Sequence, residues 1–473
     1  MNNIKTHKLF ICLSVIFGLL LVFLVAPFQT PDENSHFKKA YVISKGQIFP
    51  SYKDGIYGFE LPVNMTSYID KCTENMGDRD AKVNYSEVVI SDRLAADYGV
   101  TEQNNFSTVD TSPFAHFIQA IGIVIGKIFW RLTRDNNGSA VYLLYFARIA
   151  NLIFYTFIVA WAIKITPVLK KTMCAIALMP MSLSLAASCS YDALLVSLTC
   201  LSFAYIMNIL LKKDEWYIEK RTLVLMIIVA FIMFAIKPYC ALIYLLLFFT
   251  PKEKFKNNKD YIKKIFIFAG AVLGLYILFR IPGIISTIKT NVAGGVDNSA
   301  LQRELVLSNP FDFIKLVFNN IYVQRDYYLA TTIGVLGLID TYLPTAVTTI
   351  YLIFIISIAI IEISCSEYKI NIYTKLTVAF VLIVSLIGIS YIMYVGWTSN
   401  LADYGVGSNT ISGIQGRYFI PLLIPVWIIF SNNKLKQYKL VKRIESYFCE
   451  YHAIVYTSVL SLTVVTVLLR FWI

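Results

Sequence analysis

Long apolar segments alternate with short polar ones along almost the whole chain. Several of the apolar segments have roughly the 20 residues that an α-helix needs to cross the hydrocarbon of a bilayer. The pattern therefore predicts an all-α polytopic membrane protein, with residues 1–473 forming a single membrane domain. We expect about eleven spanning helices, near residues 9–28, 140–163, 172–188, 193–211, 222–237, 239–250, 264–281, 345–362, 375–395, 415–431 and 453–472.

Composition supports this class. Hydrophobic residues make up 57% of the chain and charged residues only 15%, whereas a soluble domain carries roughly a quarter charged residues. The formal net charge of +12 does not predict nucleic-acid binding, because the basic residues lie in short segments between apolar spans. The expected surroundings are membrane lipids, in a multi-pass protein of the cell membrane.

The distribution of Lys and Arg predicts the orientation. They gather in the connecting segments 164–171, 212–221, 252–264 and 434–443, whereas 188–192 and 396–414 have none. Short cytoplasmic loops are enriched in Lys and Arg. We therefore expect a cytoplasmic amino terminus and an extracytoplasmic carboxyl terminus.

Residues 114–130 are apolar enough to span the membrane, but the charge pattern argues that they do not. If this segment crossed, every later basic loop would face outward. We expect an interfacial helix at 114–130 instead. It would lie in a first extracytoplasmic loop at 29–139, and a second such loop would occupy 282–344.

Directly after the first span, Asp32, Glu33 and His36 stand close together in sequence. Partial burial at a membrane boundary can tune the pKa of such groups for acid/base catalysis. The alternative is a helix cap, in which Thr30 or Asp32 accepts a backbone hydrogen bond and Pro31 opens the first turn. The residues themselves leave both interpretations open.

Other candidates also fall at the predicted outer ends of spans. Tyr191 and Asp192 lie in a tight turn, where Asp192 can cap the next helix or bind a sugar hydroxyl or a metal. Lys237 ends a span, where it suits an anionic headgroup or simply reaches ordinary lipid phosphate. Arg417 offers a planar fork that matches phosphate. Arg148 lies inside a span and must be either paired with a group such as a carboxylate or functional. We count it, together with Tyr191, among the residues expected to bind substrate.

One motif is discounted. Asp78-Arg79-Asp80 spells the D-x-D pattern that soluble glycosyltransferases use to hold a metal and a nucleotide-sugar. It falls on the predicted outer side, where nucleotide-sugars are absent. We expect no role for it in catalysis.

In this order and topology, the motifs resemble a family of bacterial polytopic membrane proteins, domain of unknown function 2142. The resemblance covers nearly the whole chain. It is carried by P-D-E-x-x-H at 31–36, S-Y-D-A at 190–193, K-P at 237–238, G-V-L-G-L-I-D at 334–340 and Q-G-R-Y-F-x-P at 415–421.

That family looks like a branch of the GT-C glycosyltransferases, which transfer sugars from polyprenyl-phosphate carriers on the outer face of the membrane. The resemblance implies that Asp32 or Glu33 is the base that activates an acceptor hydroxyl of an envelope glycan. It also implies that Lys237 and Arg417 stabilise the leaving phosphate, that His36 binds acceptor or phosphate, and that direct displacement inverts the sugar. A divalent metal at Asp32 and Glu33, as in some relatives, is left open.

Two further functions compete with the enzyme. A flippase for lipid-linked glycans would need polar residues along a path through the bundle, whereas the segments near 172–187 and 345–361 are almost free of charge. The third possibility is a non-catalytic subunit of a glycan-assembly complex, in which replacement of Asp32 would leave function intact.

Overall fold

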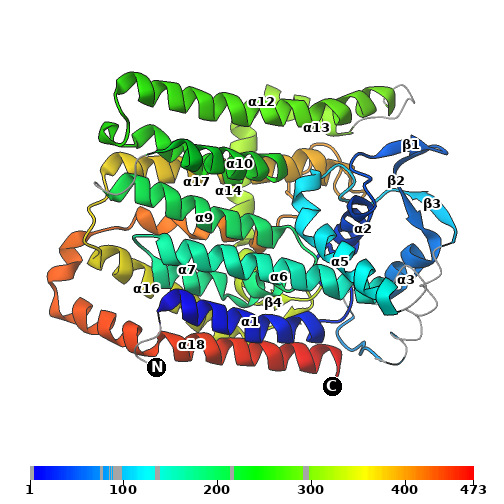
Figure 1. The fold of residues 1–473 in the computed structure, drawn as a ribbon, viewed down its shortest axis with the longest axis horizontal. Helices are drawn as coiled ribbons and strands as arrows, with labels where there is room; N and C mark the ends of the chain where they lie inside the picture. The colour runs from blue at the N-terminus through cyan, green and yellow to red at the C-terminus, as the bar shows by residue number, and fades with distance from the viewer. Residues whose placement is uncertain are drawn as a thin grey trace.

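The chain folds into a bundle of nearly parallel and antiparallel helices, which confirms the all-α polytopic class (Figure 1). The computed structural model describes residues 5–74, 78–84, 86, 88, 99–133, 139–212, 218–290 and 298–473. Parts of both predicted outer loops, including residues 89–98 and 291–297, lie outside these described residues.

Among the described helices, eight are long and apolar enough to cross a membrane. One of the eight covers Pro113–Leu132, the segment for which the charge pattern predicts an interfacial position. The other seven coincide with predicted spans: α1 (Thr6–Leu24), α6 (Ala140–Ile165), α9 (Asp192–Leu211), α12 (Asn258–Thr290), α16 (Thr345–Cys365), α17 (Ile372–Gly396) and α18 (Lys439–Phe471).

Among the described residues, the other four predicted spans are shorter or interrupted. Residues 172–188 divide into α7 and α8 at Pro180, and residues 415–431 form 3₁₀ turns around Pro421 and Pro425. Proline breaks helices because it lacks the backbone donor and clashes with the preceding turn. The elements are α7 (Lys170–Ala177), α8 (Pro180–Ala186), α10 (Lys220–Ile236), α11 (Pro238–Ala241), η2 (Leu242–Phe249), η6 (Gly416–Leu423) and η7 (Pro425–Ile428).

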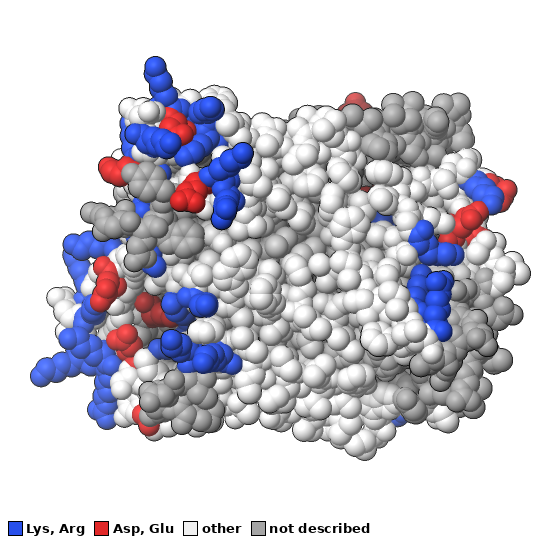
Figure 2. Space-filling view, in the orientation of Figure 1, with Lys and Arg blue, Asp and Glu red and all other residues white. Residues whose placement is uncertain are grey.

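The two ends of the bundle differ in charge. Helix α1 begins at one end and α18 finishes at the other, so the described termini lie at opposite ends (Figure 1). Lys and Arg side chains are concentrated at the end where α1 begins (Figure 2). The opposite end carries α2 (Glu33–Ser44), α3 (Val63–Thr73), η1 (Pro113–His116) and α5 (Phe117–Thr133).

Helix α6 packs against both α1 and α9, and α9 is the most deeply buried of the eight candidate spans. Gly18 of α1 lies against Leu152 of α6, where a Cβ atom would collide with the leucine side chain. One turn away, the buried hydroxyls of Ser14 and Thr156 are hydrogen-bonded at 2.7 Å. Close contact and a satisfied polar pair fix α1 against α6, and this places the residues that follow α1 over the α8–α9 turn.

A small antiparallel sheet covers part of the same end, in the order β1 (Ser51–Lys53), β2 (Ile56–Pro62) and β3 (Thr101–Asn104). Tyr52 pairs with Tyr57 and Phe59 with Asn104. The β1–β2 hairpin turns at Asp54 and Gly55, both of which have positive φ, as a two-residue type I′ hairpin requires.

The remaining elements connect α12, α16, α17 and α18. The two-stranded hairpin β4–β5 follows α15, and its Asp340 carboxylate accepts a 2.7 Å hydrogen bond from Arg470 near the end of α18. These elements are η3 (Lys252–Lys254), α13 (Asn298–Ser308), α14 (Pro310–Val323), α15 (Arg325–Ile333), β4 (Val335–Leu336), β5 (Thr341–Tyr342), η5 (Thr398–Asn400) and η8 (Asn433–Gln437).

Candidate functional site

The backbone makes a sharp turn between α1 and α2. Asp32 precedes the first residue of α2 and has φ of 59°, in the left-handed region. Its side chain accepts no hydrogen bond from the first turn of α2, so the predicted side-chain cap at Asp32 is wrong. The carbonyl of Thr30 accepts from the Glu33 amide instead. The Asp32 carboxylate is therefore available for other contacts.

The neighbouring carboxylate, Glu33, is sealed inside the protein. Arg148 of α6 donates from Nε to Oε1 at 2.8 Å and from Nη2 to Oε2 at 2.6 Å, and both side chains are fully buried. The Cys189 amide also donates to Oε1. Arg148 further donates to the carbonyls of Val22, Val25 and Ala26. Glu33 thus joins α6, the α8–α9 turn and the end of α1, and it supplies the carboxylate partner that Arg148 requires.

Asp32 turns toward a different arginine. Arg417 of η6 donates from Nη2 to the Asp32 carboxylate at 2.5 Å and from Nη1 to the Pro31 carbonyl. The arginine is buried, whereas the Asp32 side chain is half-exposed. Burial raises the pKa of Asp32, but the charge of Arg417, the field of His36 and the hydrogen bond from Arg417 together hold the pKa of Asp32 below its ordinary value. Asp32 is therefore an accessible, ionised carboxylate at neutral pH.

Asp192 links both predicted cations. Its Oδ1 accepts from Lys237 at 2.8 Å, and its Oδ2 lies 3.6 Å from Nε of Arg417. Asp192 is the first residue of α9 and makes no cap through its side chain, because Tyr191 precedes the helix. The predicted capping role of Asp192 is therefore wrong. The carboxylate instead gathers Lys237 and Arg417 beside Asp32.

Two tyrosine rings surround Lys237. Its ammonium lies 4.2 Å from the ring centroid of Tyr418 and 5.1 Å from that of Tyr191. Aromatic faces attract cations, so the rings hold the ammonium at the end of α10. Burial raises the pKa of Tyr191 to about 12, which keeps its hydroxyl protonated.

His36 joins the cluster through a second histidine. Its Nδ1 is 3.0 Å from Nε2 of His116, and its ring packs edge-on against Tyr191 with centroids 4.7 Å apart. Burial lowers the pKa of His36 to about 4. The imidazole is therefore neutral at physiological pH, and it can donate one hydrogen bond and accept another without carrying a charge.

Polar side chains from α5 and α6 position the turn beneath the cluster. Asn151 donates to the carbonyls of Ser188 and Ser190, and Gln119 donates to Ser190 and to the Asn151 side chain. Buried backbone acceptors are satisfied this way, so the Tyr191–Asp192 turn is held rigidly. The same contacts place His116, three residues before Gln119, against His36.

The structure thus brings Asp32, His36, Tyr191, Asp192, Lys237 and Arg417 into one cluster, which we call the outer charge cluster. Glu33 and Arg148 lie next to it but are sealed from it by their own pairing. Sequence reasoning missed His116 and Tyr418. Nothing in the sequence around Tyr418 indicated a functional role for it. His116 could have been found, because it is a histidine within the largely apolar segment 114–130.

The donor set does not suit a metal at Asp32 and Glu33. Both oxygens of Glu33 already accept hydrogen bonds, so Asp32, which is itself paired with Arg417, would be the only accessible carboxylate of the two. Across the described residues, no group of three or more His, Cys, Asp and Glu is placed to hold a metal ion.

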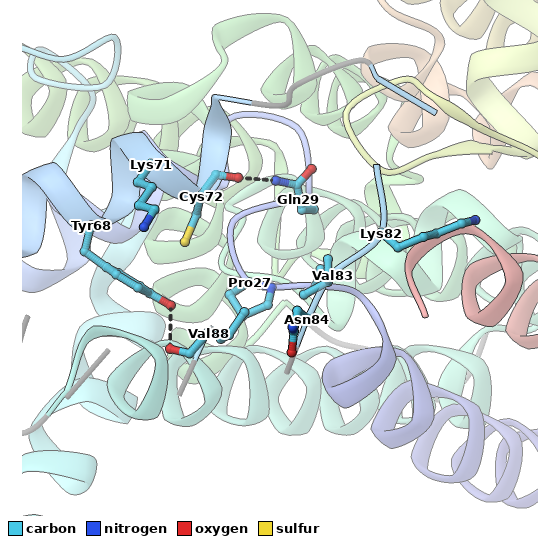
Figure 3. Close-up of a pocket in the computed structure, with 10 residues that line it drawn as sticks. Pro27, Gln29, Tyr68, Lys71, Cys72, Lys82, Val83, Asn84 and Val88 are labelled. Atoms are coloured by element: carbon cyan, nitrogen blue, oxygen red, sulfur yellow. Dashed lines mark hydrogen bonds between the residues drawn. The ribbon is translucent and has the colours of Figure 1, made fainter. Parts of the chain in front are cut away.

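A separate cavity of about 170 Å³ lies beside the segment between α1 and α2 (Figure 3). Gln29 and Cys72 meet at its wall, where the glutamine side chain donates to the cysteine carbonyl at 2.5 Å. Lys71 points into the cavity, while Lys82 points away toward α18 and donates to the Leu469 carbonyl. None of its lining residues belongs to the outer charge cluster.

Among known protein families, one matches most of this sequence. The family model described as "Predicted membrane protein (DUF2142)" matches residues 15–426. Neither the curated proteins nor the solved structures yield a match. Because the model covers most of the sequence, the chain belongs to the DUF2142 family of predicted membrane proteins.

Proposed function

We propose that this DUF2142 protein is a membrane glycosyltransferase that moves a sugar from a polyprenyl-phosphate carrier to a cell-envelope glycan. The observation that carries the proposal is the pairing of a half-exposed carboxylate, Asp32, with the buried guanidinium of Arg417. A second carboxylate, Asp192, pairs with both Arg417 and Lys237 and so holds the two cations close together. A base and two cations beside one another are what displacement at a sugar phosphate needs.

In the proposed reaction, Asp32 accepts the proton of an acceptor hydroxyl as its oxygen bonds to the anomeric carbon. The bond between that carbon and the phosphate oxygen breaks, and the phosphate leaves with the electron pair. Attack opposite to the leaving group inverts the anomeric centre. Asp32 is the base in this scheme because it is accessible, whereas Glu33 is enclosed by Arg148 and Cys189.

The ion pairs explain how charge is balanced during this step. Asp32 and Asp192 together balance Arg417 and Lys237 in the resting site. When Asp32 takes up a proton, its attraction for Arg417 weakens. The leaving phosphate gains negative charge at the same moment, so the guanidinium can turn from the carboxyl to the phosphate. A donor that is already present and oriented stabilises the transition state without reorganising solvent.

The distribution of charge between the two ends of the bundle supports a site on the side where polyprenyl-phosphate sugars are used. The cluster lies at the end opposite to the concentration of Lys and Arg (Figure 2). Positively charged loops favour the cytoplasmic side, so we place the amino terminus in the cytoplasm and the carboxyl terminus outside the cell membrane. The cluster then faces the compartment in which polyprenyl-phosphate sugars are used.

The test compares envelope-glycan composition in a parent strain, a deletion strain, and the deletion strain carrying wild-type protein or Asp32→Asn. Asp80→Asn is the matched control, because it removes an exposed carboxylate of the same outer loop. Membrane levels of every variant are measured by blot. We expect deletion to remove a sugar, Asp80→Asn to restore it, and Asp32→Asn to fail at a normal protein level.

If Asp32→Asn restored the missing sugar in the deletion strain, this result would contradict the proposal that the protein is an enzyme with Asp32 as its base. A flippase or a non-catalytic subunit would then account for the deletion phenotype. Accumulation of the lipid-linked sugar on the cytoplasmic face distinguishes the flippase, since a subunit leaves the distribution of the carrier between leaflets unchanged.

A further inference from the structure

A second cavity, of about 360 Å³, lies between the last turn of α2 and the second half of α5. Its size is within the range of ligand pockets, roughly 300–1,000 Å³. Basic side chains also gather on the surface over α2 and α5, apart from the basic band at the other end (Figure 2). The lining residues are Tyr41, Ser44, Lys45, Val124, Lys127, Ile128 and Arg131.

Three of these residues are cations, and two of them share one aromatic ring. The ammonium of Lys127 is 4.3 Å from the ring centroid of Tyr41, and that of Lys45 is 5.6 Å from it. Lys127 also donates to the Ser44 hydroxyl at 2.8 Å. One of its three N–H groups is thereby used and two are left for another acceptor.

No carboxylate of the described residues forms an ion pair with Lys45, Lys127 or Arg131. Like charges gathered around a partly enclosed space repel one another unless an anion joins them. The outer charge cluster is different, because each of its cations is matched by a carboxylate. Among the described residues, the three cations around the cavity between α2 and α5 therefore have no carboxylate within ion-pair distance, and Glu60 acts on Lys45 only from beyond that distance.

The walls of the cavity also indicate what carries that charge. Ile128 and Val124 line it and are exposed, and the exposed apolar face of α5 continues through Phe129 and Leu132. A helix with an apolar face and adjacent basic residues is typical of segments that lie in a membrane interface. A free anion needs no such wall, whereas a lipid places its phosphate among the cations and its acyl chains along the helix.

We propose that Lys45, Lys127 and Arg131 bind the phosphate headgroup of an anionic lipid in this cavity. The site is separate from the outer charge cluster. His116 ends η1 directly before α5, and Lys127 follows it by 11 residues, which corresponds to about 16 Å along the helix. The proposal does not depend on the glycosyltransferase reaction.

Lipid retention on the full-length protein provides the test. Purified wild type is placed in nanodiscs of phosphatidylcholine containing a minor fraction of phosphatidylglycerol, and the retained lipids are counted by native mass spectrometry. Each Lys or Arg near an anionic surface contributes about fivefold to binding. We expect the Lys127→Gln/Arg131→Gln variant to retain phosphatidylglycerol about 25-fold more weakly. Arg303→Gln, which removes an exposed cation of α13, is the matched control and should match wild type.

Thermal unfolding of the double variant in detergent checks that its fold is intact. Since both side chains are at the rim of a cavity, we expect its midpoint to match that of wild type. Equal retention of phosphatidylglycerol by wild type and by the folded double variant overturns the site. Displacement of the lipid by millimolar inorganic phosphate also overturns the lipid assignment, because it shows that a free anion suffices.

Discussion

Asp32 and Glu33 are adjacent in sequence, but the ion pairs that they form with Arg417 and Arg148 differ in burial and in hydrogen bonding. Arg148 uses all five of its N–H donors, on Glu33 and on three carbonyls at the end of α1. Arg417 donates from Nη1 to Pro31 and from Nη2 to Asp32, and its Nε has no hydrogen-bond partner. The first pair is fully buried, while in the second the Asp32 side chain is half-exposed.

The difference distinguishes a structural pair from the pair that we propose to be reactive. A saturated, buried guanidinium cannot exchange its partner without leaving a charge uncompensated. A guanidinium with spare donors, next to an accessible carboxylate, can take up an additional anion. Of two adjacent acidic residues, the protein thus uses Glu33 to hold α1, α6 and the α8–α9 turn together, and keeps Asp32 available for a ligand.

The largest effect is expected from breaking the sealed pair. Glu33→Ala leaves the Arg148 guanidinium buried without a counter-charge, and breaking such a pair costs about 3–5 kcal/mol. The free energy of unfolding in mixed detergent micelles measures this loss. A variant within about 1 kcal/mol of wild type would show that the pair does not hold the fold.

The pH dependence of stability provides a second test, through His36, which lies near the Asp32–Arg417 pair. Burial lowers the pKa of His36 to about 4, from an ordinary value of 6.5. Between these pH values the unfolded chain binds a proton that the folded protein does not. Stability is therefore complete above pH 6.5 and falls as the pH approaches 4, by about 3 kcal/mol. Unfolding free energy measured across this range should decline in wild type, and His36→Gln should flatten the decline.

Replacing each arginine by lysine tests whether the two differ in how many of their N–H donors are needed for stability. Lysine has three donors and no planar fork. Arg148→Lys gives up at least two buried hydrogen bonds and should destabilise the protein by about 3 kcal/mol. Arg417→Lys should cost only about 1 kcal/mol. Unfolding of both variants under the same conditions gives the ranking, and equal losses would refute the distinction between the two arginines.

The smallest effect on stability is expected from Asp32→Asn. A half-exposed ion pair contributes little, so the free energy of unfolding should change by less than about 1 kcal/mol. The same denaturation measurement applies. A loss as large as that of Glu33→Ala would mean that Asp32 is also structural.

Topology made much of the cluster predictable. Asp32, Asp192, Lys237 and Arg417 come from four separate segments, and only their common position at the outer ends of spans links them in sequence. The alternating direction of the helices then brings them together. The charge pattern also indicated that Arg148 needed a carboxylate.

Other features could not be read from hydropathy. Hydropathy averages composition over about 20 residues, and it does not register that Pro421 breaks a helix into 3₁₀ turns. Which of two adjacent carboxylates meets Arg148 depends on the backbone turn at Asp32, whose φ is positive. His116 lies against His36 only because η1 and α5 fold back over α2, a long-range contact that no local pattern encodes.

The most direct test of the central claim is the amount of envelope glycan restored per unit of membrane protein, compared for Asp32→Asn and Glu33→Gln. We predict that Asp32→Asn reaches wild-type protein levels and restores no glycan. Glu33→Gln should lose protein from the membrane and retain glycan in proportion to the protein that remains. Full restoration by Asp32→Asn, or a well-folded Glu33→Gln without glycan, would contradict the assignment of a reactive Asp32 beside a structural Glu33.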